Sequence, residues 1–122
     1  MSSKGTSKVI SAIDSARENI GLIQAWAKGR DLETLKADTL IRYAIERAFI
    51  AVHSAITDIP VGLLAGHVIP AGMIAGFRNA LAHTYDDIID ERVILTIRDD
   101  LPALDSALKA MRRSLLGSQG DE

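Results

Sequence analysis

The segment Arg78-Asn-Ala-Leu-Ala-His-Thr-Tyr85 places a guanidinium, an imidazole and a phenol within eight residues. Arginine can bind a phosphoryl group through two parallel hydrogen bonds, and histidine transfers protons near neutral pH. These side chains therefore indicate chemistry on a phosphate group, with Arg78 holding the phosphate and His83 moving a proton. The alternative is a plain helix end, in which His83 caps the last carbonyls and Tyr85 packs its ring.

Helix geometry limits how these side chains can cooperate. On a straight helix Arg78 and Tyr85 lie within about 20° of each other around the axis, whereas His83 lies about 140° from Arg78. One straight helix therefore cannot direct all three side chains at one point. We expect either that the helix ends before His83, or that a second copy of the chain completes the site.

A second charged pair, Arg42 and Glu46, lies four residues apart on a predicted helix. One interpretation is an ion pair at the helix surface, worth a few tenths of a kcal/mol. The other is that the pair supports a neighbouring site by positioning its residues. The sequence leaves both interpretations open.

Metal and cofactor chemistry is not expected. Cysteine is absent, and the histidines, His53, His67 and His83, are too far apart in the sequence to form a local metal pair. The acidic residues between Asp86 and Glu91 precede a predicted helix, so capping of that helix is favoured over cation binding. We predict no metal site and no cofactor.

The elements that must position these residues are helices, because apolar residues recur at intervals of three and four. The pattern predicts a helix from about Val9 to Ala27 that stops at Gly29, and a second over about 33–57. One short helical turn is expected within 61–71, followed by a third long helix from about Ala71.

The most regular apolar pattern lies near the C-terminus, at Ile94, Ile97, Leu101, Leu104, Leu108, Met111 and Leu115. Pro102 lies within it and cannot donate a backbone hydrogen bond. We predict a kink or a restart of the helix there, with Asp99 or Asp100 capping the new start.

The fold class predicted is all-α, an antiparallel bundle of four to five helices, because no segment alternates with period two. We expect one domain over 8–116, with disordered polar tails at 1–7 and 117–122.

Composition narrows the environment and the partners. The chain has 122 residues and a net charge of −2, which excludes a protein that coats nucleic acid by overall charge but allows a local basic site. No run of apolar residues is long enough to span a membrane, and the lack of cysteine suits a reducing cytoplasm. We expect a cytoplasmic protein without a membrane partner.

Arg78, His83 and Tyr85 match the R-x4-H-x-Y signature, and the chain around it resembles the HepT-like RNase toxins of the HEPN superfamily. Asn79 after the arginine is also typical of that family. The resemblance runs from about Asp38 to Leu104 and includes the blocks Ile41–Arg47, Ile69-Pro70 and Asp99–Leu104.

Two positions depart from the family pattern. His53-Ser54-Ala55 stands where members usually have Gly-Glu-Ala, and Ala71 stands where they have tryptophan. The resemblance implies that an acid at position 54 would contact the motif arginine, a contact that Ser54 cannot make as an ion pair.

The resemblance implies a metal-independent endoribonuclease that acts as a homodimer, the toxin of a type VII-like toxin-antitoxin pair. RNA is the implied substrate, with tRNA as one candidate, and DNA is not. The implied roles are a base for the 2'-hydroxyl (His83), a cation for the phosphorane (Arg78), and RNA binding (Tyr85). The implied antitoxin is a minimal nucleotidyltransferase that silences the toxin by transferring AMP to Tyr85.

Two other functions remain open from the sequence. One is a non-catalytic helical partner that binds a nucleotide or presents a substrate to a nucleotidyltransferase. The other is a dimerisation module whose motif has decayed. Incubation with RNA in the absence of metal separates the ribonuclease from both.

Overall fold

The computed structural model describes residues 3–65 and 91–120, and every structural statement below concerns these residues. They form helices without a strand, which confirms the all-α prediction. The elements are α1 (Ser3–Ala27), α2 (Leu32–Ala37), α3 (Thr39–Thr57), α4 (Val61–Ala65), α6 (Glu91–Leu95), the π-helical turn η1 (Thr96–Asp100) and α7 (Leu101–Gly120).

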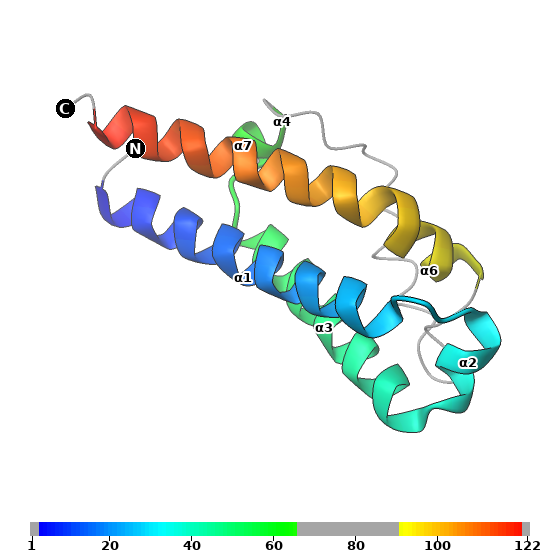
Figure 1. Ribbon diagram of the computed structural model, residues 1–122. Helices are drawn as coiled ribbons and strands as arrows, with labels where there is room; N and C mark the ends of the chain where they lie inside the picture. Colours follow the sequence, from blue (N-terminus) through cyan, green and yellow to red (C-terminus); the bar gives the residue numbers. More distant parts are fainter. Residues whose placement is uncertain (1–2, 66–90, 121–122) are drawn as a thin grey trace.

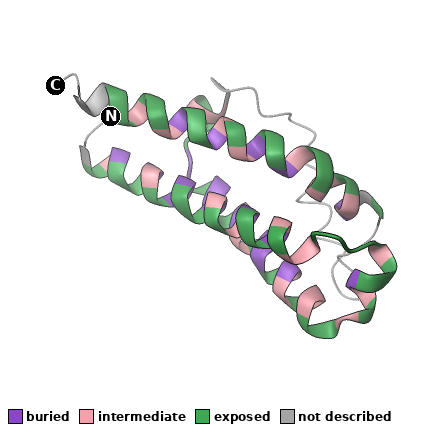
Figure 2. Ribbon diagram, viewed as in Figure 1, coloured by how far each residue is buried: buried purple, intermediate pink, exposed green. Residues whose placement is uncertain are grey.

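Helix α1 lies at the centre of the described bundle and packs against both α3 and α7 (Figure 1). The α7 helix runs antiparallel beside α1, and Figure 2 shows buried residues along their facing sides. The core consists of aliphatic side chains at helical spacing together with Phe49. Its largest fully buried members are Ile13, Ile20, Ile23, Leu35, Ile45, Val52, Leu101, Leu104, Leu108 and Met111.

The ends of the bundle differ from the predicted tails. Helix α1 already begins at Ser3, and Thr6 is only 4% exposed. Thr6 lies three residues before Val9, so it continues the buried stripe of α1 and extends the helix by about one turn. At the other end α7 continues to Gly120, past the predicted boundary at 116.

The connection from α1 to α2 follows the sequence signals. Gly29 has a φ of +74°, a left-handed conformation that glycine adopts without strain, so the predicted stop is confirmed. Asp31 caps α2 by accepting a hydrogen bond from the Thr34 backbone N–H at 2.8 Å. This bond lowers the pKa of Asp31, so the cap stabilises the folded state at neutral pH and weakens as acid protonates the carboxylate.

The single helix predicted over 33–57 is wrong, because the structure divides it at Asp38. Asp38 has φ −93° and ψ +96°, which is extended backbone, and its side chain accepts from the Ile41 N–H at 3.1 Å. A second bond to its carboxylate comes from Arg30 at 3.3 Å. Asp38 therefore ends α2 and caps α3, a role for which aspartate is well suited.

The chain leaves α-helical geometry just before Pro102, where a kink or a restart was predicted, but it does so through the π turn η1, and the predicted aspartate cap is wrong. Leu101 is helical, with φ −63° and ψ −42°, and Asp99 and Asp100 lie inside η1 rather than at a new cap. The Leu101 N–H donates to the carbonyl of Thr96, five residues back. A π turn suits this place because Pro102 cannot donate the bond that would continue an ordinary α turn.

The π turn changes which side chains face the core. A π turn takes about one residue more than an α turn, which shifts the helical face by about 100°. Accordingly Val93 is only 4% exposed, whereas Ile94 and Ile97, predicted on the buried stripe, are half-buried at its edge. The predicted stripe placed Ile94 and Ile97 on the same face as Leu101, because it did not include the extra residue of a π turn.

Two ion pairs join α1 to α7. Arg17 Nε lies 3.0 Å from Asp105 Oδ1, and Arg112 Nε lies 2.8 Å from Asp14 Oδ1. All four side chains are partly exposed, so each pair contributes up to about 1 kcal/mol. Their main effect is to fix the register of the two antiparallel helices.

The α1 stripe leads to a stability prediction. Replacing Ile20, which is 0% exposed, with alanine is expected to lower the free energy of unfolding by about 2–5 kcal/mol, because it leaves a cavity between α1 and its neighbours. Leu22→Ala, at a site 38% exposed on the same helix, is the matched control and should cost under about 1 kcal/mol. Urea unfolding measures both; equal losses would contradict the assignment of the core.

Candidate functional site

The R-x4-H-x-Y residues lie outside the described residues. This applies to the predicted catalytic pair, Arg78 and His83, to Tyr85, and to Asn79. Their assignment therefore still depends on the sequence. The structure does place the predicted supporting residues, Arg42 and Glu46, and the surfaces around them.

Arg42 and Glu46 lie on a half-buried face of α3 that borders the core stripe at Phe49. At 100° per residue the two side chains lie within about 40° of each other, so both interpretations of the pair remain compatible with its position. The Arg42 Cζ also lies 5.3 Å from the centre of the Tyr43 ring, a cation–π arrangement at the exposed edge of this face.

His53 belongs to the same face, since it lies about 20° from Arg42 around the α3 axis. Its side chain is half-buried, and its Nε2 atom is buried without a hydrogen-bond partner among the described residues. A buried ring nitrogen without a partner is uncommon in folded proteins. His53 follows Glu46 by seven residues, or about two helical turns, so the sequence could have indicated that they share a face. The sequence analysis did not use this signal.

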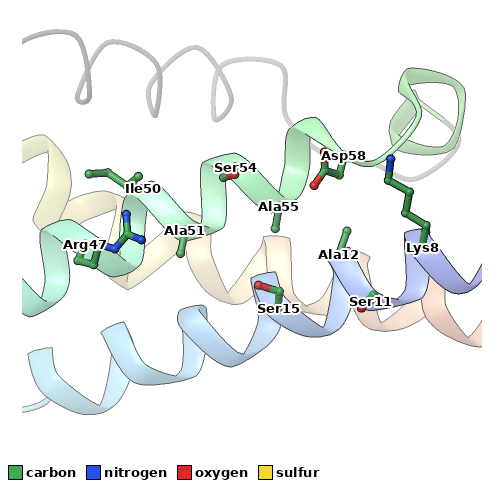
Figure 3. A pocket seen from close by; sticks show the side chains of 10 residues that line it. All are labelled: Lys8, Ser11, Ala12, Ser15, Arg47, Ile50, Ala51, Ser54, Ala55 and Asp58. Carbon is green, nitrogen blue, oxygen red and sulfur yellow. The ribbon is translucent and has the colours of Figure 1, made fainter.

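Ser54 lies elsewhere on α3, about 120° from Arg42. It is exposed and lines a groove of about 470 Å³ between α1 and α3, shown in Figure 3. Lys8 and Arg47 stand toward opposite ends of this groove, and Asp58 lies at the same end as Lys8. The departure from the family pattern at position 54 therefore lies on the groove wall rather than on the face of Arg42 and Glu46.

A second pocket, of about 260 Å³, lies where the end of α1 meets α6 and η1. Its lining includes three cationic side chains, and its apolar lining comes from α1 and from the α6 and η1 segment. The lining residues are Gln24, Ala27, Lys28, Arg30, Ile94, Ile97 and Arg98. The sequence analysis missed this pocket because its residues come from segments about 70 positions apart.

Within residues 3–65 and 91–120 no group of three or more histidine, aspartate or glutamate side chains is placed to hold a metal ion. No helix there is long and apolar enough to cross a membrane.

The described residues form an all-helical bundle, which is the fold class expected of a HepT-like protein. A family model described as Ribonuclease HepT-like matches residues 16–111. The chain therefore belongs to the HepT-like ribonuclease family. No curated protein and no solved structure matches the chain significantly.

The matched range is wider than the resemblance seen in the sequence, which began near Asp38. It extends from Ala16 in the middle of α1 to Met111 in α7. The match therefore includes the Arg78–Tyr85 segment and the whole of α3. It also includes every residue that lines the basic pocket at the end of α1.

Proposed function

We propose that this protein is a metal-independent endoribonuclease that acts as the toxin of a toxin-antitoxin pair. The observation that carries the proposal is the HepT-like family match over residues 16–111, which contains the complete R-x4-H-x-Y segment. The family assignment supports RNA as the substrate class.

The proposed reaction uses the RNA's own 2'-hydroxyl as the nucleophile. His83 takes the proton from this hydroxyl, and the 2'-oxygen forms a bond to the adjacent phosphorus. Arg78 binds the phosphate oxygens and stabilises the additional negative charge of the phosphorane. The bond to the 5'-oxygen then breaks, and this oxygen takes up a proton from an acid or water. The products are a 2',3'-cyclic phosphate and a 5'-hydroxyl.

The proposal includes a homodimer and a nucleotidyltransferase antitoxin. A shared cleft between two copies would resolve the angular offset of about 140° between Arg78 and His83. Transfer of AMP to the Tyr85 hydroxyl would add bulk and negative charge beside the bound phosphate, and so repel RNA. Tyr85 without the adduct can stack on a base.

The first test is cleavage without divalent metal. RNA incubated with the purified protein in EDTA is expected to be cut at a rate within about twofold of the rate in magnesium, because the proposed groups are side chains alone. End-group analysis should find a 2',3'-cyclic phosphate on one product and a 5'-hydroxyl on the other.

Two results would contradict the proposal. Cleavage that EDTA abolishes, with 5'-phosphate products, would indicate a metal-activated water instead of the 2'-hydroxyl. Absence of cleavage from a protein that still binds a nucleotidyltransferase would favour the non-catalytic helical partner.

A further inference from the structure

The basic pocket at the end of α1 is built from two segments that are far apart in the sequence, 24–30 and 94–98. Lys28 and Arg30 follow α1, whereas Ile94, Ile97 and Arg98 come from α6 and η1. Figure 1 shows the end of α1 near α6 at the same end of the bundle as α2. Packing alone brings these residues together, so the pocket is a property of the fold.

The charges on this pocket have one sign. Lys28, Arg30 and Arg98 are all exposed, and among the residues that the structure describes no aspartate or glutamate lines the pocket. Arg30 is partly neutralised by Asp38, at 3.3 Å, but Lys28 and Arg98 form no ion pair within the described residues. An anion is therefore the ligand that the pocket favours.

The floor of the pocket is apolar because of the π turn. The shift of about 100° that η1 introduces takes Ile94 and Ile97 out of the fully buried stripe, where Val93 replaces them. Together with Ala27 they line the pocket beneath the cations. An adjoining hollow of about 300 Å³ shares Ile94 and Arg98 and adds Leu32, Leu95 and one acid, Glu91. The surface thus pairs apolar contact area with positive charge.

RNA has the matching chemistry. Its phosphates are anionic at every nucleotide, and its sugars and bases offer apolar faces. The motif tyrosine precedes Glu91, the first residue of α6, by six positions, which an extended chain can span in about 21 Å at most. The chain length therefore sets an upper limit of about 21 Å on the distance between the tyrosine and the start of α6.

We propose that the pocket formed by Lys28, Arg98, Ile94 and Ile97 is a docking site for the RNA backbone. Lys28 and Arg98 contact phosphate oxygens, and a ribose or base lies on the two isoleucines. This inference rests on the proposed ribonuclease function and names a part of the substrate path that the R-x4-H-x-Y motif does not contain.

The test measures RNA binding as a function of salt. A labelled single-stranded RNA of about 12 nucleotides is titrated with the His83→Ala protein, in which cleavage is expected to be blocked. Adding Lys28→Gln and Arg98→Gln should reduce the slope of log affinity against log salt by about 1.4, since each phosphate contact to a single strand contributes about 0.7. At 0.1 M salt the same relation gives a loss of about 25-fold in affinity.

The matched control removes the same charge from the other groove. Lys8→Gln with Arg47→Gln also replaces one exposed lysine and one exposed arginine, on the surface between α1 and α3. This control should change RNA affinity by less than about threefold. Circular dichroism of each variant checks that the helices remain intact.

The outcomes separate this inference from the function it rests on. Equal losses in the two double variants would show that RNA responds only to overall charge, and would overturn the docking site. Unchanged RNA binding by the Lys28 and Arg98 variant, with cleavage intact in the otherwise unaltered protein, would overturn it alone. Loss of nucleotidyltransferase binding instead would assign the surface to a protein partner. Failure of the unaltered protein to cleave or bind RNA would overturn both.

Discussion

His83→Ala is expected to abolish measurable RNA cleavage, with a fall in kcat/KM of about 10²–10⁴-fold or more. The reason is that alanine cannot take the proton from the 2'-hydroxyl, a step in which a positioned base accelerates the reaction by that factor. Single-turnover cleavage of a defined RNA, with enzyme in excess, measures the effect directly.

The stability of the variant decides between catalysis and packing. A histidine in the site should be replaceable with a change of less than about 1 kcal/mol in the free energy of unfolding. His67→Ala is the control, because the sequence analysis assigns that histidine no role, and it should keep full activity. If His83→Ala unfolds the protein, the helix-end interpretation of His83 is right.

Tyr85→Phe is expected to eliminate AMP transfer to the protein. Phenylalanine keeps the aromatic ring for stacking but lacks the hydroxyl oxygen that must attack the α-phosphate of ATP. Intact-protein mass spectrometry after incubation with the cognate nucleotidyltransferase and ATP should find adenylyl adducts on the unaltered protein and none on the variant.

Tyr43→Phe is the matched control for this experiment. Tyr43 is 60% exposed on α3, so its hydroxyl is accessible to a transferase, and it is the chain's other tyrosine. This variant should accept AMP like the unaltered protein. An adduct mapped to Tyr43, or no adduct from a transferase that is active on other substrates, would reject AMP transfer to Tyr85.

The sequence predicted the main helices well because their apolar spacing is regular. The stripe of α1 from Val9 to Ile23 and the stripe of α7 from Leu101 to Met111 are both buried as expected. The break at Asp38 was missed, because an aspartate within an apolar pattern can lie inside a continuous helix or can cap the start of a new one. The bonds from Ile41 and Arg30 decide in favour of the cap.

The site was predictable only where its residues are close in the sequence. Arg78, His83 and Tyr85 lie within eight residues and match the family signature, so the sequence could propose them as a site, and that assignment stays a prediction because they lie outside the described residues. Lys28 and Arg98 could not be connected in that way, since their proximity depends on the packing of α1 against η1. Val93 lies in the core in place of Ile94 because of a single π turn, which apolar spacing does not reveal.

The pairing of α1 with α7 has a consequence for when the protein can fold. The ion pairs between these helices join residues 88 and 98 positions apart, and the core between them includes side chains from both. Contacts between residues so distant in the sequence form late. A long loop must first close, at a cost in chain entropy, before these contacts can stabilise the fold. During synthesis α1 and α3 emerge first, and the core stays incomplete until α7 has left the ribosome. A ribonuclease built in this way acquires its folded form only after most of its chain has been translated.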